Sequence, residues 1–341
     1  MGNFKSFSVS RVFIPLNVFA HHPTIFSVVL DRKTNFSFLM KYIYITGRGR
    51  SGSTVIDAML GNSKSIESVG ELVSGLGRFN AMCSCGKGMN ECGYWTSVRR
   101  NYESKTEQSW DKFARDTVKS GHVKEFMDTL FGNSKFNREL VKDTEQFTQG
   151  LLEVAGKEAI LDSSKNPNRA LWLAKFYGDS KIIHLVKHPD GVAASKYKFI
   201  GRGKGYKFLR KTYLNPKLAP VYMTVEAISW MIGNTMIGLI KLIRPKKVML
   251  VKYEDFGAKP EVIFEKLSKF LEIDLGEVRD AVINGHPLTF GHTIGGNGVR
   301  NSETFVFSTK KGKKRPMPTF YKVLIRIFCW PLMLIYGYKF I

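Results

Sequence analysis

The chain has 341 residues, of which 43% are hydrophobic, so it can bury a sizeable core and is long enough for one large domain. Lysine and arginine (52) outnumber aspartate and glutamate (29), and the net charge of +23 predicts an anionic partner: a substrate, cofactor, lipid or nucleic acid. Four cysteines are too few for a disulfide scaffold in a chain of this size.

Residues 1–39 precede the first predicted strand. The apolar stretch 12–30 is interrupted by two prolines and two histidines, which makes a poor bilayer-spanning helix. Because Met40 stands directly before the strand, we expect residues 1–39 to be an N-terminal extension that the fold does not need, and residues 40–341 to form the domain.

Short apolar runs alternate with longer helical segments along the rest of the chain, which predicts an α/β fold with a central parallel sheet flanked by helices. Strands are predicted at 42–46, 159–163, 181–187 and 247–253, with another ending just before Glu71. Helices are predicted after the glycine-rich loop, within 108–156, after Asn166-Pro167, from near Asp190, over 218–243 and over 260–271.

Two of the helical segments are strongly apolar. The segment 218–243 contains Glu226, Asn234 and Lys241, which is typical of a core helix rather than a membrane span. The C-terminal segment 320–341 contains Lys322 and Arg326, and it predicts either a helix docked on the domain or a helix on a membrane surface.

The stretch "GRGRSGST", residues 47–54, follows the first strand and opens a helix. Such a turn points backbone N–H groups and the positive end of a helix dipole at one spot, which binds phosphate or sulfate. The lysine that a nucleoside-triphosphate loop carries before its Ser/Thr is replaced by Ser53, and the basic groups are Arg50 and Arg48 instead. This pattern predicts an anion site unlike that of an ATPase or kinase.

The loop resembles that of the sulfotransferases, which bind 3′-phosphoadenosine 5′-phosphosulfate (PAPS) through a strand–loop–helix with [KR]-S-G-[ST]-T. A second block, "IIHLVKHPDGVAASKYKF", is similar to the family's 3′-phosphate motif, with Lys187 in place of the usual arginine and Ser195 at the required spacing. Lysine lacks the bidentate fork of arginine, which weakens this contact or shares it with other groups. "ILDSSKNPNRALWL", "VKYEDFGAKPEV", "HTIGGNGVR" and "CSCGKGMNECGYW" also resemble family segments, in the family's order.

The resemblance implies a P-loop-containing nucleotide-hydrolase-like (sulfotransferase) fold over residues 40–341 and assigns roles to named residues. The residues expected to bind the donor are Arg48, Gly49, Arg50, Ser51, Gly52, Ser53, Thr54, Lys187, Ser195, Asn297 and Arg300. The residues expected to act in catalysis are Glu71, Arg50 and Lys165. Glu71 is the expected base for the acceptor hydroxyl, and Lys165 would contact the sulfuryl group or the acceptor.

Alternatives to these assignments remain. His188 and His184 are rivals to Glu71 as the base, although His184 lies inside an apolar strand and is the more typical of a core residue. Asp162 is a weaker candidate at the strand end that precedes Lys165.

The cysteines Cys83, Cys85 and Cys92 could hold zinc, form a local disulfide or stay reduced. No histidine or fourth cysteine lies nearby in the sequence to complete a tetrahedral site, so we expect no metal.

The predicted function is PAPS-dependent transfer of a sulfuryl group to a hydroxyl acceptor, such as a carbohydrate or glycoconjugate. One alternative is a P-loop kinase that uses ATP, with Asp162 as the evident magnesium ligand. The other is a non-catalytic basic protein that binds nucleic acid or anionic membrane through 196–211 and 310–341. We expect a cytoplasmic enzyme with no nucleic-acid partner, and peripheral membrane contact through the C-terminal segment is left open.

Overall fold

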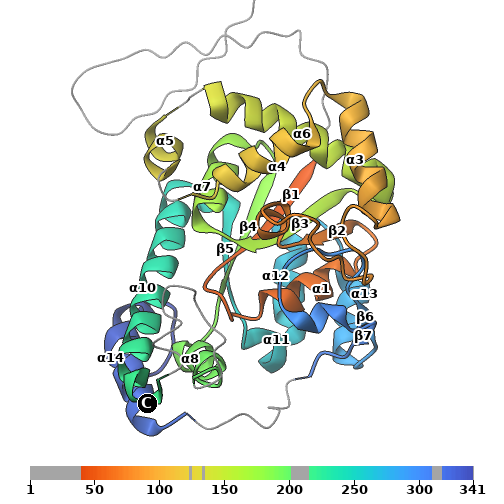
Figure 1. Cartoon of the computed structure of the whole chain (residues 1–341). Coiled ribbons are helices and arrows are strands. Elements are labelled where there is room, and N and C mark those ends of the chain that lie inside the picture. The colour runs from red at the N-terminus through yellow and green to blue at the C-terminus, as the bar shows by residue number, and fades with distance from the viewer. Residues whose placement is uncertain (1–39, 123–124, 133–134, 201–214, 309–316, 341) are drawn as a thin grey trace, which may run out of the picture. The chain divides into compact units, whose positions relative to one another are not determined.

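The computed structural model describes residues 40–122, 125–132, 135–200, 215–308 and 317–340. In this part of the chain, five parallel strands form a central sheet in the order β2-β3-β1-β4-β5 (Figure 1). The strands are β1 (Lys41–Thr46), β2 (Ile66–Gly70), β3 (Ala159–Lys165), β4 (Ser180–Val186) and β5 (Val248–Lys252). The predicted α/β class with a central parallel sheet is confirmed, whereas the expected extension, residues 1–39, lies outside the described residues.

Both faces of the sheet are covered, which explains why the strands are nearly continuous apolar runs. In β1, Tyr42 and Tyr44 belong to one core cluster, whereas Ile43 and Ile45 belong to the other. The tyrosine side packs against α3 (Gly93–Lys105), α4 (Trp110–Lys119), α6 (Lys135–Ala155) and α7 (Pro167–Phe176). The isoleucine side packs against α1 (Ser53–Gly61), α12 (Pro260–Leu271) and α13 (Gly276–Ile283).

A third core cluster lies at the β5 side of the molecule, where α8 (Pro189–Tyr197), α10 (Ala219–Ile243) and α14 (Thr319–Ile335) pack together (Figure 1). Cys329 and Met333 of α14 are buried in it. The C-terminal helix therefore docks on the domain, one of its two predicted positions, although much of its outer face is apolar and exposed.

The long helix α10 is held to the sheet by polar residues spaced four apart along one face. Glu226 pairs with Arg48, the Trp230 indole N–H donates to the Lys187 carbonyl (3.1 Å), and Asn234 Oδ1 lies 3.0 Å from His184 Nε2. Together with its 3-10 extension, α10 (216–243) is also long and apolar enough to cross a membrane by length and composition. These contacts support the predicted role of a core helix.

The remaining elements are short. They are α2 (Leu72–Leu76), α5 (Phe126–Phe131), α11 (Asp255–Ala258), the 3-10 turns η3 (Pro216–Leu218), η4 (Pro245–Lys247) and η5 (Gly298–Asn301), and a two-stranded ribbon of β6 (Leu288–Thr289) and β7 (Thr304–Phe305). The predicted strands agree with the observed ones to within two residues, and each predicted helix is present. Helices α2, α3, α11 and α13 were not predicted.

Candidate active site

The order of the strands predicts a ligand site at the carboxyl ends of β1 and β4. After β1 the chain crosses to β2 on one side of the sheet, whereas after β4 it crosses to β5 on the other. In open α/β sheets, ligands bind at the carboxyl ends of two neighbouring strands whose connections leave toward opposite sides of the sheet. The two predicted anion motifs are the segments that follow β1 and β4, so the topology brings them to the same place.

The loop after β1 leaves several donors without acceptors. Gly52 caps α1 with left-handed backbone (φ 95°), and the cap receives no side-chain hydrogen bond. Among the described residues, the amides of Gly52, Ser53 and Thr54 have no acceptor, and the buried Ser51 Oγ has no partner. Unpaired donors at a helix N-terminus favour a bound acceptor, and a phosphate oxygen is one that this geometry suits.

Two glycines in this loop are required by close contacts. A Cβ on Gly47 would lie 2.2 Å from the Leu185 carbonyl oxygen, and one on Gly52 would lie 2.2 Å from Cε2 of Tyr253. Both glycines also have positive φ, which other residues adopt only with strain. The glycines therefore let the loop lie against β4 and against the Tyr253 ring.

The segment after β4 contacts the loop directly. Arg50 has left-handed backbone (φ 77°), and its Nε donates to the Ser195 Oγ on α8 at 3.0 Å. Lys187, the residue after β4, places its Nζ 3.9 Å from the centre of the Tyr253 ring. Two motifs that are 145 residues apart in the sequence are thus joined by one hydrogen bond.

Arg48 is engaged elsewhere. Its Nε and Nη2 each donate to a carboxylate oxygen of Glu226 at 3.1 Å, and Lys196 Nζ lies 3.4 Å from the same carboxylate. Glu226 is 2% exposed, so this is a buried carboxylate shared by two cations. Arg48 therefore anchors the loop to α10, and donor binding by Arg48 stays a prediction.

Glu71 and Lys165 meet at the carboxyl ends of β2 and β3. Lys165 Nζ pairs with Glu71 Oε1, and both side chains are about four-fifths buried, with exposures of 16% and 18%. Lys165 has left-handed backbone (φ 64°), an unusual conformation for a residue with a long side chain. The Ser74 hydroxyl donates to the other Glu71 oxygen at 3.2 Å. The structure thus brings two of the three predicted catalytic residues together.

The glycine-rich segment near the C-terminus lies beside both groups. The Ile294 carbonyl accepts from the Glu71 amide (2.7 Å), and the Ile294 amide donates to the Val69 carbonyl (3.0 Å). The segment therefore pairs with the end of β2. A Cβ on Gly296 would lie 3.5 Å from Glu71 Oε1 and 3.6 Å from Thr54 Oγ1. This segment therefore spans the distance between the predicted base and the phosphate loop.

Asn297 and Arg300 belong to this segment but differ in their exposure to solvent. Asn297 is exposed, whereas the Arg300 guanidinium donates to the carbonyls of Thr293 and Met82, at 2.8 Å each. Burial lowers the pKa of Arg300. Arg300 holds two segments of the chain together, and contacts of either residue with the donor stay predictions.

The rival residues have other partners. His184 is buried in β4 beside Asn234, and burial lowers its pKa to about 4, so it is a neutral core residue as expected. His188 Nδ1 accepts from the Asp190 amide and caps α8. Asp162 is fully buried, with Tyr42 and Ser164 as donors, and burial raises its pKa. Because its carboxylate oxygens already accept hydrogen bonds from side chains and backbone, Asp162 is not positioned to bind magnesium.

Sequence reasoning missed three contributors. Glu226 was read only as a polar residue of a core helix, and no local pattern links it to Arg48. Tyr253 was part of a recognised segment, but nothing in the letters shows that its ring covers Gly52. The expectation that no histidine lies near Cys83, Cys85 and Cys92 is wrong in three dimensions, because the fold brings His292 to them.

A family profile matches the part of the chain that contains both anion motifs. The profile of the Sulfotransferase family matches residues 43–277, which include both anion motifs and Glu71. No curated protein matched the chain. Solved structures with similarity include a sulfotransferase from Alicyclobacillus acidocaldarius (14% identity, 88% of this chain and 96% of that chain, TM-score 0.43). Another is the sulfotransferase domain of the Synechococcus PCC 7002 olefin synthase (17% identity, 70% of this chain and 75% of that chain, TM-score 0.36). A third is the sulfotransferase domain of the curacin biosynthetic pathway (19% identity, 71% of this chain and 77% of that chain, TM-score 0.39).

These TM-scores are below 0.5, so the assignment depends on the family profile and not on the solved structures. The matched region is more than two-thirds of the chain and contains the whole central sheet except the first two residues of β1. The chain therefore belongs to the sulfotransferase family.

Proposed function

We propose that this sulfotransferase uses PAPS as its donor and transfers the sulfuryl group to a hydroxyl. The observation that carries the proposal is the 3.0 Å hydrogen bond from Arg50 to Ser195, which joins the loop after β1 to the helix after β4. PAPS carries phosphate at both its 5′ and 3′ positions, so two adjoining anion sites suit it. A nucleoside triphosphate would instead require a lysine at Ser53 and a free acidic ligand for magnesium.

The loop residues would stabilise the charge that develops on the leaving group. The unpaired amides of Gly52, Ser53 and Thr54, together with the Ser51 hydroxyl, would bind the 5′-phosphate. Arg50 would contact the oxygen that bridges phosphate and sulfur as negative charge accumulates there. Lys187 and Ser195 would bind the 3′-phosphate, with Asn297 and Arg300 on the other side.

Glu71 would accept the proton of the attacking hydroxyl. Its carboxylate lies at the same edge of the sheet, beside Gly296 and paired with Lys165. When Glu71 takes up the proton, its attraction for the Lys165 ammonium weakens. Lys165 could then interact with the sulfuryl oxygens, so the ion pair would serve both the proton transfer and the charge on sulfur.

The acceptor that we propose is a hydroxyl of a carbohydrate or glycoconjugate. The net charge of +23 supports an acidic glycan, because an excess of positive charge raises the local concentration of anions. Incubation of the enzyme with labelled PAPS and a panel of neutral and acidic glycans tests this. Labelling of the acidic members is expected, and labelling confined to small phenols or alcohols would contradict it.

We also propose a cytoplasmic enzyme that contacts anionic membrane through the outer surface of α10 and α14. Exposed apolar residues gather on these two adjacent helices: Val221, Ile228, Ile232, Leu239, Phe320, Ile327, Trp330 and Leu334. Lys217, Lys241 and Arg244, at the two ends of α10, are exposed as well, and apolar side chains with nearby positive charge favour an interfacial position. Co-sedimentation with vesicles of anionic phospholipid, which should be lost in Trp330→Ser/Leu334→Ser, tests this contact.

Isothermal titration of the purified full-length protein tests the proposed donor site. Adenosine 3′,5′-bisphosphate should bind, whereas ATP with magnesium should bind much more weakly. Arg50→Ala removes a charge-assisted contact of about 1.5–3 kcal/mol and should weaken binding of the bisphosphate about 10- to 100-fold and abolish turnover.

The matched control is Arg279→Ala, which removes a half-exposed arginine on α13 that pairs with Asp280 and should leave binding unchanged. Preferential binding of ATP with magnesium would favour the kinase alternative. Binding of neither nucleotide, together with tight binding of an oligonucleotide, would favour the nucleic-acid alternative.

A further inference from the structure

Three cysteines and one histidine meet on the opposite side of Glu71 from β3, outside the proposed donor site. Cys83 and Cys85 lie in the turn that precedes α3, Cys92 is the residue before α3, and His292 comes 200 residues later. The four ligand atoms, three Sγ and one Nδ1, all lie within 4.8 Å of one another.

Four of the six distances between these atoms are close to the edges of a metal-centred tetrahedron. The Sγ of Cys92 lies 3.6 Å from that of Cys85 and 3.8 Å from that of Cys83. The His292 Nδ1 lies 3.7 Å from Cys83 Sγ and 3.5 Å from Cys92 Sγ. Zinc bonds of about 2.3 Å to sulfur and about 2.0–2.1 Å to nitrogen give edges of roughly 3.8 Å and 3.6 Å in a regular tetrahedron.

The surrounding chain holds the four ligands in place. The amide of Cys83 donates to the Lys87 carbonyl at 2.9 Å, and Gly86 has the positive φ (86°) that lets the turn close. The His292 ring stacks on Tyr94, with centres 4.7 Å apart, and its carbonyl accepts from the Trp95 indole at 2.8 Å. These contacts hold the ring and the backbone of His292 while its Nδ1 faces Cys83 and Cys92.

We propose that Cys83, Cys85, Cys92 and His292 bind one Zn²⁺ ion. Three thiolates and an imidazole are a ligand set that zinc prefers over harder cations. All four positions of a tetrahedral ion are filled by protein, so the ion has no open position for a substrate and its role is structural. This proposal revises the expectation that the chain carries no metal.

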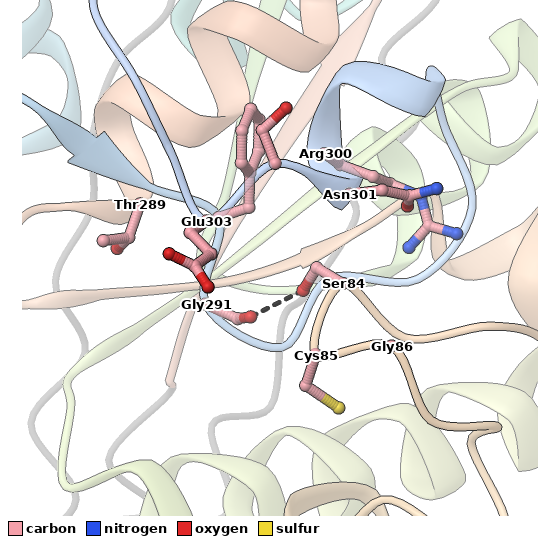
Figure 2. A pocket seen from close by; sticks show the side chains of 10 residues that line it. Ser84, Cys85, Gly86, Thr289, Gly291, Arg300, Asn301 and Glu303 are labelled. Carbon is pink, nitrogen blue, oxygen red and sulfur yellow. Dashed lines mark hydrogen bonds between the residues drawn. The ribbon is translucent and has the colours of Figure 1, made fainter.

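The ion would fix the segment that borders the candidate active site. The Ser84 hydroxyl donates to the Gly291 carbonyl, and Figure 2 shows the Cys85 turn beside Gly291 and Arg300 around a pocket of about 510 Å³. Cys83 also forms a β-bridge with Ile294, the residue whose carbonyl accepts the Glu71 amide. Zinc would therefore link the cysteine turn to the segment that lies next to Glu71.

The first measurement is the metal content of the wild-type chain, purified under reducing conditions with zinc in the growth medium. One zinc per chain by mass spectrometry is expected. Replacement of the zinc by Co²⁺ should give the charge-transfer and d–d absorption of a tetrahedral thiolate site. This readout does not depend on the donor, so a failure of the proposed sulfotransferase activity would leave it unaffected.

The variant to test is Cys85→Ser, because Cys85 is exposed and its replacement leaves the core intact. Loss of one of four ligands should lower zinc affinity by at least about 100-fold, measured by competition with a chromophoric chelator. Cys329→Ser is the matched control, since Cys329 is buried between α14 and α10 and should leave affinity unchanged.

Three results would overturn the proposal. The first is wild-type protein that remains folded with far less than one equivalent of zinc after metal is supplied. The second is unchanged affinity in Cys85→Ser. The third is a disulfide among Cys83, Cys85 and Cys92, found by peptide mapping of protein kept under the reducing conditions used for purification.

Discussion

Replacement of Glu226 by glutamine should destabilise the protein, because this buried carboxylate neutralises two cations. Its oxygens accept two hydrogen bonds from Arg48 at 3.1 Å, and Lys196 lies at 3.4 Å. Glutamine keeps the size of the side chain but replaces one acceptor oxygen with an NH₂ group that faces a cation. It also removes the negative charge that Arg48 and Lys196 share.

The magnitude follows from these contacts. Loss of one charge-assisted hydrogen bond costs about 1.5–3 kcal/mol, and breaking a fully buried ion pair costs about 3–5 kcal/mol. Arg48 and Lys196 keep 19% and 11% exposure, so water relieves part of the penalty. We expect a loss of about 3 kcal/mol, which lowers Tm by roughly 6 °C at about 2 °C per kcal/mol for a domain of this size.

Thermal unfolding followed by circular dichroism at neutral pH measures the effect. The control is Glu265→Gln, which removes the same charge from an exposed position on α12 and should change Tm by no more than about 1 °C. If Glu226→Gln melts within 1 °C of its control, the carboxylate contributes little, and the proposed anchoring of the phosphate loop to α10 is wrong.

Three further predictions concern the site and the core. Glu71→Gln should reduce kcat by about 10²- to 10⁴-fold while binding of adenosine 3′,5′-bisphosphate is retained, and near-normal kcat would reassign the base. Gly52→Ala should weaken that binding, since a Cβ would lie 2.2 Å from the Tyr253 ring, and Tyr253→Ala should partly restore it in the double variant. The pKa of His184 is about 4 in the folded protein and about 6.5 when unfolded. As the pH falls, the unfolded chain therefore binds the proton before the folded protein does. The contribution of His184 to the free energy of unfolding is complete above pH 6.5 and falls by about 3 kcal/mol as the pH drops to 4. A His184→Gln variant that loses stability as steeply as wild type over this range of pH would contradict the assignment.

The sheet was predictable because its signals are local. Each strand of a doubly covered parallel sheet must be apolar on both faces, so runs such as Tyr42–Thr46 can be read from the letters. The phosphate loop is equally local, since its glycines are required by contacts within and immediately around the turn. Ser195 was assigned to the donor site only by the family resemblance, and the structure brings it to the loop because the carboxyl ends of parallel strands share one edge of the sheet.

The contacts that were not predicted join residues far apart in the chain. Arg48 and Glu226 are 178 residues apart, and Cys92 and His292 are 200 residues apart. The charge or type of a residue indicates that it needs a partner. It does not indicate which of the many residues of suitable type the fold brings to it. Helix α3 escaped prediction for a different reason: it is rich in polar residues, and only Trp95, Val98 and Tyr102 are buried.

The pairing of Ile294 with Val69 and Glu71 has a consequence for synthesis of the protein. The strands and the phosphate loop are complete once β5 has been made, but the partner that holds the Glu71 backbone lies more than forty residues later. A nascent chain still attached to the ribosome can therefore form the sheet while Glu71 lacks its final support. We infer that the enzyme becomes competent only after Ile294 has been synthesised and has paired with the end of β2.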